Sequence, residues 1–484
     1  MKNHSLIALL KTFTKDEIRE FSDFINSPYF NNRSAVNRLY EMLIIHYPEF
    51  DNTEISKTAL YKKIFPGKKY NDSTFRVLLS GVNELALKFI TGKYIQSDLP
   101  GYNLNKIKAL MDRNVLSGIE KIFSETYSHL SNPDMKSIDT FFYLHLFDNA
   151  KTNFLSEKYS GIFDRFIEES EHDKGFENLL TYFYIKLLSN YINMLNIELL
   201  FNKKFEKENT ERFFQSIDID KYRKHIIIEL YYYIVLMLKD SLNENYYFKV
   251  KNIFYKNLNK LNMNDIVEIF INLQNFCSRK VSNGAVEFYK EKFDIYKKEL
   301  KYKTYLINGK MSPVYFMTLV SLALKLGELK WTKKFIKDYS GELNEITHDN
   351  TVFYSLALYE FAVGDFNKSQ EYLTGIRFTD LYQKLDTKVL QIMIFYELNY
   401  EDSLISSLEA FRHFLSNNKL IPENKFIYYD NLYKSVKKLI SLKKRYDKLE
   451  IKYFISQINS KTNFINKTWL LEKAKQLLTS NSPN

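Results

Sequence analysis

The 484-residue sequence predicts an all-α protein, in which an N-terminal helical module precedes an α-solenoid of stacked helical hairpins. Turn-forming residues are scarce, since the chain holds 13 glycines and 8 prolines, about a third of the usual share. Strand-and-turn folds need such residues, so their scarcity favours long helices with short connections. Hydrophobic residues make up 45% of the chain, enough for folded cores, and the chain is too long for a single core.

Composition also restricts the class of protein. Cys277 is the one cysteine of the sequence, which excludes an internal disulfide, and its apolar neighbours predict a buried, inert thiol. The most apolar stretch, 226–238, contains Glu229 and is too short for a membrane span, so we expect a buried helix there. The five-residue apolar run near the N-terminus is too short for a signal peptide core. We therefore expect a cytoplasmic protein without membrane contact.

The positive charge is concentrated in two windows. Residues 55–93 and 434–452 each hold eight Lys or Arg and two acids, which gives +6 for each window. The net charge of the chain is +11, so the remainder carries 11 − 12 = −1. Two concentrated patches attract anionic partners better than the same charge spread evenly. The alternative interpretation is a solvated lysine-rich face.

Residues 1–95 are expected to form the N-terminal module. A capping box, "TKDE", opens its first clear helix, because Thr14 and Glu17 can satisfy each other's free backbone amides. Pro28 biases Ser27 out of the α region, so this helix is expected to end there.

The stretch "SPYFNN" (27–32) is expected to form a packed corner between two antiparallel helices. Tyr29 and Phe30 would fill the open end of the helix interface, and Asn31 or Asn32 would cap the next helix.

Two further corners, "YPEFDN" and "FPGKKYND", enclose a short helix over 56–65. Asp72 or Ser73 is then expected to cap a helix over 72–90, whose apolar stripe begins at Phe75. The segment "GKYIQSDLPGYNL" (92–104) is the expected boundary of the module, because it contains two glycines and a proline.

Residues 105–310 show helical patterns separated by polar segments, with no clear strand alternation, and are expected to form an irregular helical-repeat region. A regular repeat is predicted in 311–478, together with C-terminal helices. "SLAL" occurs at 321–324 and 355–358, 34 residues apart, and another 34 residues lead to the apolar run "VLQI" (389–392). Small residues follow the turns at equivalent places, at Thr332, Ser369 and Ser403. A period of 34 with small residues where helices cross is typical of tetratricopeptide repeats, although a generic array of helical hairpins predicts almost the same architecture.

As a whole, the chain resembles a large uncharacterised family of bacterial tetratricopeptide-like helical-repeat proteins. The matching segments are "SPYFN" (27–31), "YPEF" (47–50), "FPGKKYND" (65–72), "NFCSRKVSNG" (275–284) and "SPVYFMTLVSLALKLGE" (312–328). This resemblance implies a tetratricopeptide-like fold and no assigned activity, and it carries over no catalytic or binding residue.

Residues 55–92 also resemble the helix-turn-helix part of bacterial transcriptional activator domains, in which a winged helix precedes tetratricopeptide-like repeats. The shared features are a short helix, an aromatic-proline turn, and an Arg-containing helix with a regular apolar stripe. The resemblance implies a wing, which "TGKYIQSDLPGYNLNK" (91–106) would have to form as a β-hairpin.

Sequence motifs of common enzymes are absent. No Walker loop, "GxGxxG", "GxSxG" or "HExxH" occurs, and no two histidines lie three or four residues apart. We therefore predict a non-enzymatic protein with no catalytic residue, metal or cofactor; an activity in 105–310 is the alternative.

The leading functional hypothesis is a scaffold that binds another protein or a peptide. Stacked hairpins expose the first helix of each repeat along one groove, and such grooves commonly accept a peptide or a helix. The repeat register places four residues toward this groove: Tyr354, Phe361, Lys388 and Tyr396. The alternative interpretation is that each of them packs between neighbouring repeats.

The second hypothesis is a nucleic-acid-binding regulator that uses the basic N-terminal module. The corner lysines would contact phosphates, and Arg76, which lies off the apolar stripe, would reach base edges. Ser80 and Asn83 follow it on the same face and could hydrogen-bond to bases or phosphates. The corner lysines are Lys62, Lys63, Lys68 and Lys69. A solubilising surface on this module is the competing interpretation.

Overall fold

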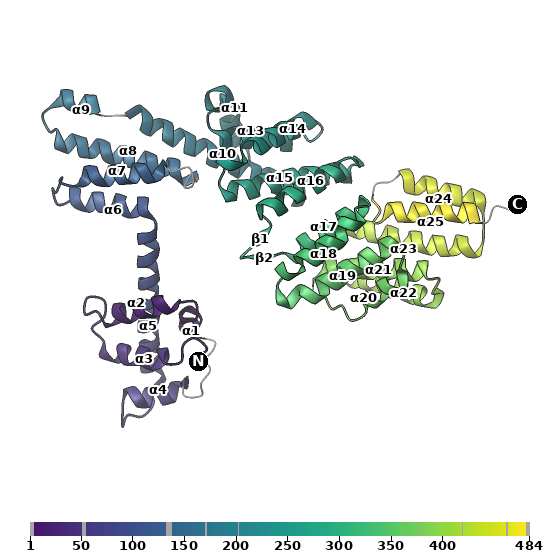
Figure 1. Ribbon diagram of the computed structural model, residues 1–484, viewed down its shortest axis with the longest axis horizontal. Helices are drawn as coiled ribbons and strands as arrows, with labels where there is room; N and C mark the ends of the chain where they lie inside the picture. The colour runs from purple at the N-terminus through teal and green to yellow at the C-terminus, as the bar shows by residue number, and fades with distance from the viewer. Residues whose placement is uncertain are drawn as a thin grey trace. The chain divides into compact units, whose positions relative to one another are not determined.

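The computed structural model describes residues 4–50, 55–131, 138–169, 172–201, 203–378, 380–418, 420–460 and 463–480. These residues are helical throughout except for connections and one two-stranded hairpin, which confirms the predicted all-α class (Figure 1). The chain forms two compact units, Met1–Tyr184 and Ile185–Asn484. Each is described separately below as the first and the second unit.

The first unit contains two hydrophobic cores. Helices α1 to α5 share one of them, with Phe21, Leu39 and Phe75 fully buried at its centre. Helices α6 to α8 share the other, around Ile107 and Phe147. The helices are α1 (Ser5–Leu10), α2 (Lys15–Asn26), α3 (Ser34–Ile44), α4 (Lys57–Ile64), α5 (Asp72–Ser97), α6 (Leu99–Met111), α7 (Ile119–Leu130), α8 (Ile138–Lys158) and α9 (Phe163–Glu169). Helix α10 (His172–Phe201) spans the division between the units.

The predicted capping box at the start of α2 is confirmed. Thr14 Oγ1 accepts from the Glu17 amide at 3.1 Å, and Glu17 Oε2 accepts from the Thr14 amide at 2.9 Å. The helix ends at Asn26, and Ser27 has an extended backbone, as the following proline predicts.

The corner after α2 differs from the prediction. Tyr29 is 87% exposed and does not fill the helix interface, so that prediction is wrong, whereas Phe30 stacks on Phe24 with 4.0 Å between ring centroids. Neither Asn31 nor Asn32 caps α3, because Arg33 occupies the N-cap position without a side-chain hydrogen bond. Asn31 instead spans the corner: it donates to the Ile25 carbonyl at 2.9 Å and accepts from the Arg33 amide at 3.0 Å.

Helix α5 begins at Asp72, where the predicted helix begins, and ends at Ser97, later than predicted. Asn71, rather than Asp72 or Ser73, caps it by accepting from the Thr74 amide at 2.9 Å. The segment predicted to form a wing is helical, because α5 continues to Ser97 and α6 begins at Leu99. Pro100 is accommodated in the first turn of α6, where its missing N–H leaves no hydrogen bond unmade.

The second unit starts with irregular helices and one short hairpin. After α10 come α11 (Glu208–Gln215), α12 (Ile219–Tyr222), α13 (Ile226–Lys239), α14 (Glu244–Lys256), a 3₁₀ turn (Leu258–Lys260), α15 (Met263–Ser282) and α16 (Phe288–Tyr302). Strands β1 (Leu306–Ile307) and β2 (Lys310–Met311) pair antiparallel. Asn308 and Gly309 form their turn with φ of 50° and 74°, and Asn-Gly is a strong sequence signal for such a hairpin.

Three helical hairpins follow, and their first helices begin 32 and 36 residues apart, on either side of the predicted 34. They are α17 (Pro313–Lys325) with α18 (Leu329–Tyr339), α19 (Glu345–Val363) with α20 (Phe366–Leu373), and α21 (Leu381–Glu397) with α22 (Glu401–Asn417). A 3₁₀ turn (Ser340–Glu342) separates the first two. Helix α19 packs against α17, α20 and α21. The tetratricopeptide assignment itself stays a prediction.

Small residues lie at two of the three predicted helix crossings. Thr332 and Ser369 are fully buried, and Ser369 Oγ donates to the Ala357 carbonyl of the partner helix at 2.7 Å. The prediction is wrong for Ser403, which is exposed, because Leu404 occupies the buried position of α22.

The unit ends with α23 (Glu423–Lys444), α24 (Lys448–Ser460) and α25 (Lys467–Ser480). These helices share one core with α21 and α22. A residue of α25, Trp469, packs edge-on against Tyr396 of α21 at 5.4 Å between centroids. The last hairpin of the array is therefore covered by the C-terminal helices.

Candidate functional site

The four predicted groove residues lie on the first helices of two hairpins. On α19, Tyr354 is 8% exposed and contacts Phe378 edge-on at 5.8 Å, while the half-buried Phe361 contacts Phe366 of α20 at 5.3 Å. On α21, the ammonium of half-buried Lys388 lies 5.3 Å from the ring centroid of Phe414, and Tyr396 is 8% exposed. All four thus make packing contacts inside the array, and their role toward a partner stays a prediction.

A carboxylate that the sequence did not single out lies beside one of these residues. Asp386 of α21 is exposed to solvent, and the Tyr429 hydroxyl of α23 donates to it at 3.4 Å. Desolvation by the surrounding protein raises the pKa of Asp386 to about 6, while the hydrogen bond from Tyr429 acts to lower it. Tyr354 is close enough for Asp386 to raise its pKa as well, after the larger effect of burial. Residues of α19, α21 and α23 therefore lie near one another at this point.

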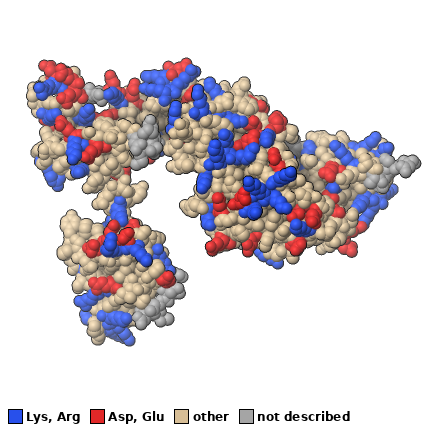
Figure 2. Space-filling model, viewed as in Figure 1, with Lys and Arg blue, Asp and Glu red and all other residues tan. Residues whose placement is uncertain are grey.

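The predicted nucleic-acid residues all belong to α4, α5 and their connection. Lys62, Lys63, Lys68, Lys69, Arg76 and Ser80 are exposed, and Asn83 is half-buried. Figure 2 shows Lys and Arg atoms at the end of the module where α4 lies. The arrangement gives a basic surface. Two carboxylates reduce its positive charge on α5: Asp72 pairs with Arg76 at 2.6 Å, and Glu84 lies on the same helix face.

The geometry of this region departs from a winged helix-turn-helix. The connection between α4 and α5 runs from Phe65 to Asn71, longer than the turn of roughly three or four residues in that motif. Residues 91–106 are helical on both sides of Asp98 and supply no wing. The expectation of a winged helix from the activator-domain resemblance is thus wrong.

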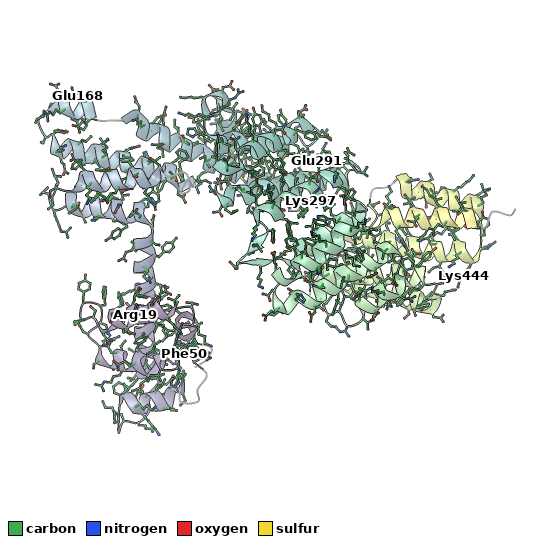
Figure 3. The ribbon with its side chains drawn as sticks, in the orientation of Figure 1. Arg19, Phe50, Glu168, Glu291, Lys297 and Lys444 are labelled. Carbon is green, nitrogen blue, oxygen red and sulfur yellow. The ribbon has the colours of Figure 1, made fainter. Side chains whose placement is uncertain are left out.

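Four of the eight Lys and Arg residues of the second basic window, 434–452, form ion pairs. Lys434 pairs with Asp430 at 2.6 Å, Lys437 with Glu409 at 3.5 Å, and Lys438 with Glu450. Lys444 at the end of α23, labelled in Figure 3, pairs with Glu401. Because these cations already have carboxylate partners, this window offers less attraction to an anion than its sequence indicates.

Cys277 is buried, as predicted, within a polar cluster of α14, α15 and α16. Its thiol donates to the Tyr247 hydroxyl at 3.5 Å, and that hydroxyl donates to Glu291, labelled in Figure 3, at 2.9 Å. Burial raises the pKa of Cys277 to about 11. The thiolate is therefore disfavoured at neutral pH, which suits a packing role.

Two surface hollows are lined in part by polar side chains. One, of about 400 Å³, is lined by the pairs Glu198–Lys207 and Glu211–Lys239. The other, of about 730 Å³, lies between α6 and α8. The buried carboxyls Asp265 and Glu299, whose pKa values burial raises to about 6 and about 7, line neither hollow.

Among the described residues, no helix combines the length and apolarity that crossing a membrane requires. The same part of the chain holds no group of three His, Cys, Asp or Glu side chains suited to a metal ion. Comparisons with family models, with curated proteins and with solved structures found no match to this chain.

Proposed function

We propose that the chain is a helical-repeat scaffold that binds another protein along α19, α21 and α23. The run of three hairpins carries this proposal, because stacked hairpins present their first helices side by side, here α19 and α21. Helix α23 extends this surface, since its Tyr429 hydroxyl donates to Asp386 of α21. Surfaces of this kind commonly accept an extended peptide or a helix. A cytoplasmic location is part of the same proposal and is supported by the single, unpaired cysteine.

Exposed side chains on these helices supply the contact surface. Tyr382 of α21 is 41% exposed, and Lys425 of α23 is exposed near Asp386. Tyrosine and long charged side chains are common in protein interfaces because they combine apolar area with a polar end. Tyr354 and Tyr396 are buried, so their role would be to pack beneath the exposed side chains rather than to contact the partner.

The test is a pull-down from the native host with the tagged full chain and with the double variant Tyr382→Ala, Lys425→Ala. We expect the wild type to recover a specific partner and the double variant to lose it, because both side chains are on the proposed surface. Far-UV circular dichroism should be unchanged, since neither side chain is buried.

The matched control removes the same two residue types from α24, as Lys452→Ala with Tyr453→Ala, both of which are exposed. This control should recover the partner as well as the wild type does. Equal recovery by both double variants would contradict the assignment of the surface.

A second candidate is nucleic-acid binding by the N-terminal module, favoured by the joint exposure of its basic residues on α4, the connection and α5. We expect duplex DNA to shift in a gel at about 50 mM salt and much less at about 200 mM, because phosphate contacts weaken steeply with salt. Replacing Lys62, Lys63, Lys68 and Lys69 by Ala should shallow the salt slope by about 1 for each lysine that contacts a phosphate.

The control for this experiment is the replacement of four exposed lysines of α18 by Ala, which removes the same charge elsewhere. These lysines are Lys330, Lys333, Lys334 and Lys337. If no shift occurs at the lower salt, or if both variants weaken binding equally, the N-terminal module is not a nucleic-acid interface.

A further inference from the structure

The hollow between α6 and α8 of the first unit combines an apolar floor with a polar rim. These two helices pack against each other and against α7 (Figure 1). The volume of the hollow is about 730 Å³, within the range of known ligand sites, roughly 300–1,000 Å³. Two of its floor residues are buried and three are half-buried. The floor residues are Leu104, Ile107, Met111, Leu146 and Ala150.

Two asparagines of α8 line the rim one helical turn apart. Asn149 and Asn153 are both exposed, and side chains four residues apart on a helix are separated by about 5–6 Å. In an extended chain, every second residue points its backbone N–H and C=O to the same side, a repeat of about 6.6 Å. An asparagine amide offers both donors and an acceptor. The pair therefore matches the polar edge of an extended peptide.

Both amides retain hydrogen-bonding capacity. His145 Nδ1 donates to the Gly175 carbonyl at 2.9 Å, which leaves Nε2 of the neutral ring to accept from the Asn149 amide at 3.0 Å. This bond orients Asn149 and leaves it one N–H and its carbonyl oxygen. The Asn153 side chain makes no hydrogen bond within the part of the chain that the structure describes.

The end of the hollow where both helices terminate is negative. Asp112 follows the last residue of α6, and Glu157 lies in the last turn of α8. Neither carboxylate forms an ion pair within the described ranges. The C-terminal ends of helices carry partial negative charge of their own, which favours a cation nearby. Among the described residues that line the hollow, Lys108 is the one cation, so the carboxylates outnumber it.

We propose that this hollow binds an extended peptide segment of a partner protein. Asn149 and Asn153 hydrogen-bond to its backbone, an aliphatic side chain covers the floor, and a Lys or Arg lies between Asp112 and Glu157. Main-chain hydrogen bonds supply affinity in such complexes, and side-chain pockets supply specificity. The exposed rim leaves the hollow open, which suits a chain that continues beyond it. This inference goes beyond the proposed function, because the hollow lies in the first unit.

The length of the hollow sets the spacing of the recognised residues. From Leu104 to Asp112, α6 rises by about 12 Å at 1.5 Å per residue. An extended chain covers this distance in about four residues. A basic residue within about four positions of an aliphatic one is therefore the expected pattern.

The test pans phage-displayed randomised heptapeptides against the tagged full chain. We expect enrichment of peptides with the predicted pattern of an aliphatic and a basic residue. An enriched peptide is then synthesised with a fluorescein label, and its dissociation constant is measured by fluorescence anisotropy. Asn153→Ala should weaken binding by about threefold to tenfold, because it removes hydrogen bonds to the peptide backbone. The matched control, Asn105→Ala, should bind normally, since Asn105 is exposed on α6 and does not line the hollow.

A second pair of variants tests the charge. Asp112→Asn with Glu157→Gln should weaken binding at least about fivefold at low salt. The control removes the same two charges from α9 of the same unit, as Asp164→Asn with Glu168→Gln, both of which are exposed. It should bind as the wild type does. All these side chains are exposed, so folding should be preserved in each variant.

Three outcomes would overturn the proposal: no enrichment, enrichment of acidic peptides, or equal affinity of the wild type and the hollow variants. The surface proposed on α19, α21 and α23 is distinguished by measuring the same peptide with Tyr382→Ala, Lys425→Ala. Loss of binding in that variant, with normal binding by Asn153→Ala, would assign the peptide to the other surface and overturn the hollow. The reverse pattern supports the hollow, whatever the pull-down recovers.

Discussion

Replacing Lys473 by methionine is expected to lower the free energy of unfolding of the second unit by about 3–5 kcal/mol, the usual cost of breaking a buried ion pair. Lys473 of α25 pairs with Glu397 of α21 at 2.7 Å, and the two side chains are 9% and 11% exposed. Methionine has a similar length but no charge. It would therefore leave the Glu397 carboxylate buried, with the Trp469 indole as its remaining strong donor at 2.6 Å.

Urea unfolding followed by far-UV circular dichroism measures this effect. Lys475→Met is the matched control, because Lys475 is exposed on the same helix, and it should change stability by about 0.5 kcal/mol or less. The double variant Lys473→Met, Glu397→Leu should recover most of the loss, since apolar residues can replace a buried pair at little cost. A loss below about 1 kcal/mol for Lys473→Met would show that the pair is not enclosed as described.

The hairpin array is predictable because its signals are local. The spacing of 34 residues, the small Thr332 and Ser369, and the Thr14–Glu17 capping box each act within one helix or between neighbours in the chain. Local chemistry also explains a missed element, since the Asn308-Gly309 turn carries a hairpin signal in the sequence. Repeat periodicity says less about a single position, as the exposed Ser403 shows.

Contacts between distant residues had no such signal. Tyr429 and Asp386 are 43 residues apart, and Trp469 and Glu397 are 72 apart, so no spacing rule connects them. The period of 34 led from Tyr354 to Lys388, whereas the polar group that the fold places beside Tyr354 is Asp386. Charge counting has the same limit: it cannot show that the lysines of 434–452 face carboxylates on neighbouring turns and helices.

The N-terminal module provides a direct test of which aromatic residues stabilise it. Phe21→Ala is expected to cost about 3–5 kcal/mol, the usual loss for truncating a buried phenylalanine. Phe21 is fully buried and contacts Phe13 at 5.6 Å, Tyr40 at 5.0 Å and Phe89 at 5.4 Å between ring centroids. Its removal would leave a cavity between α2, α3 and α5.

Hydrogen exchange followed by mass spectrometry measures this loss for the module within the full chain, as faster exchange of amides in α2 and α5. Tyr29→Ala is the control, because Tyr29 is an aromatic residue of the same module and is 87% exposed. It should change local stability by about 0.5 kcal/mol or less, as is usual for surface substitutions. The sequence alone would assign Tyr29 a packing role at the corner, so the two variants distinguish the structure from that prediction. Faster exchange in Tyr29→Ala, equal to that in Phe21→Ala, would mean that the corner is packed and that the exposed position of Tyr29 is wrong.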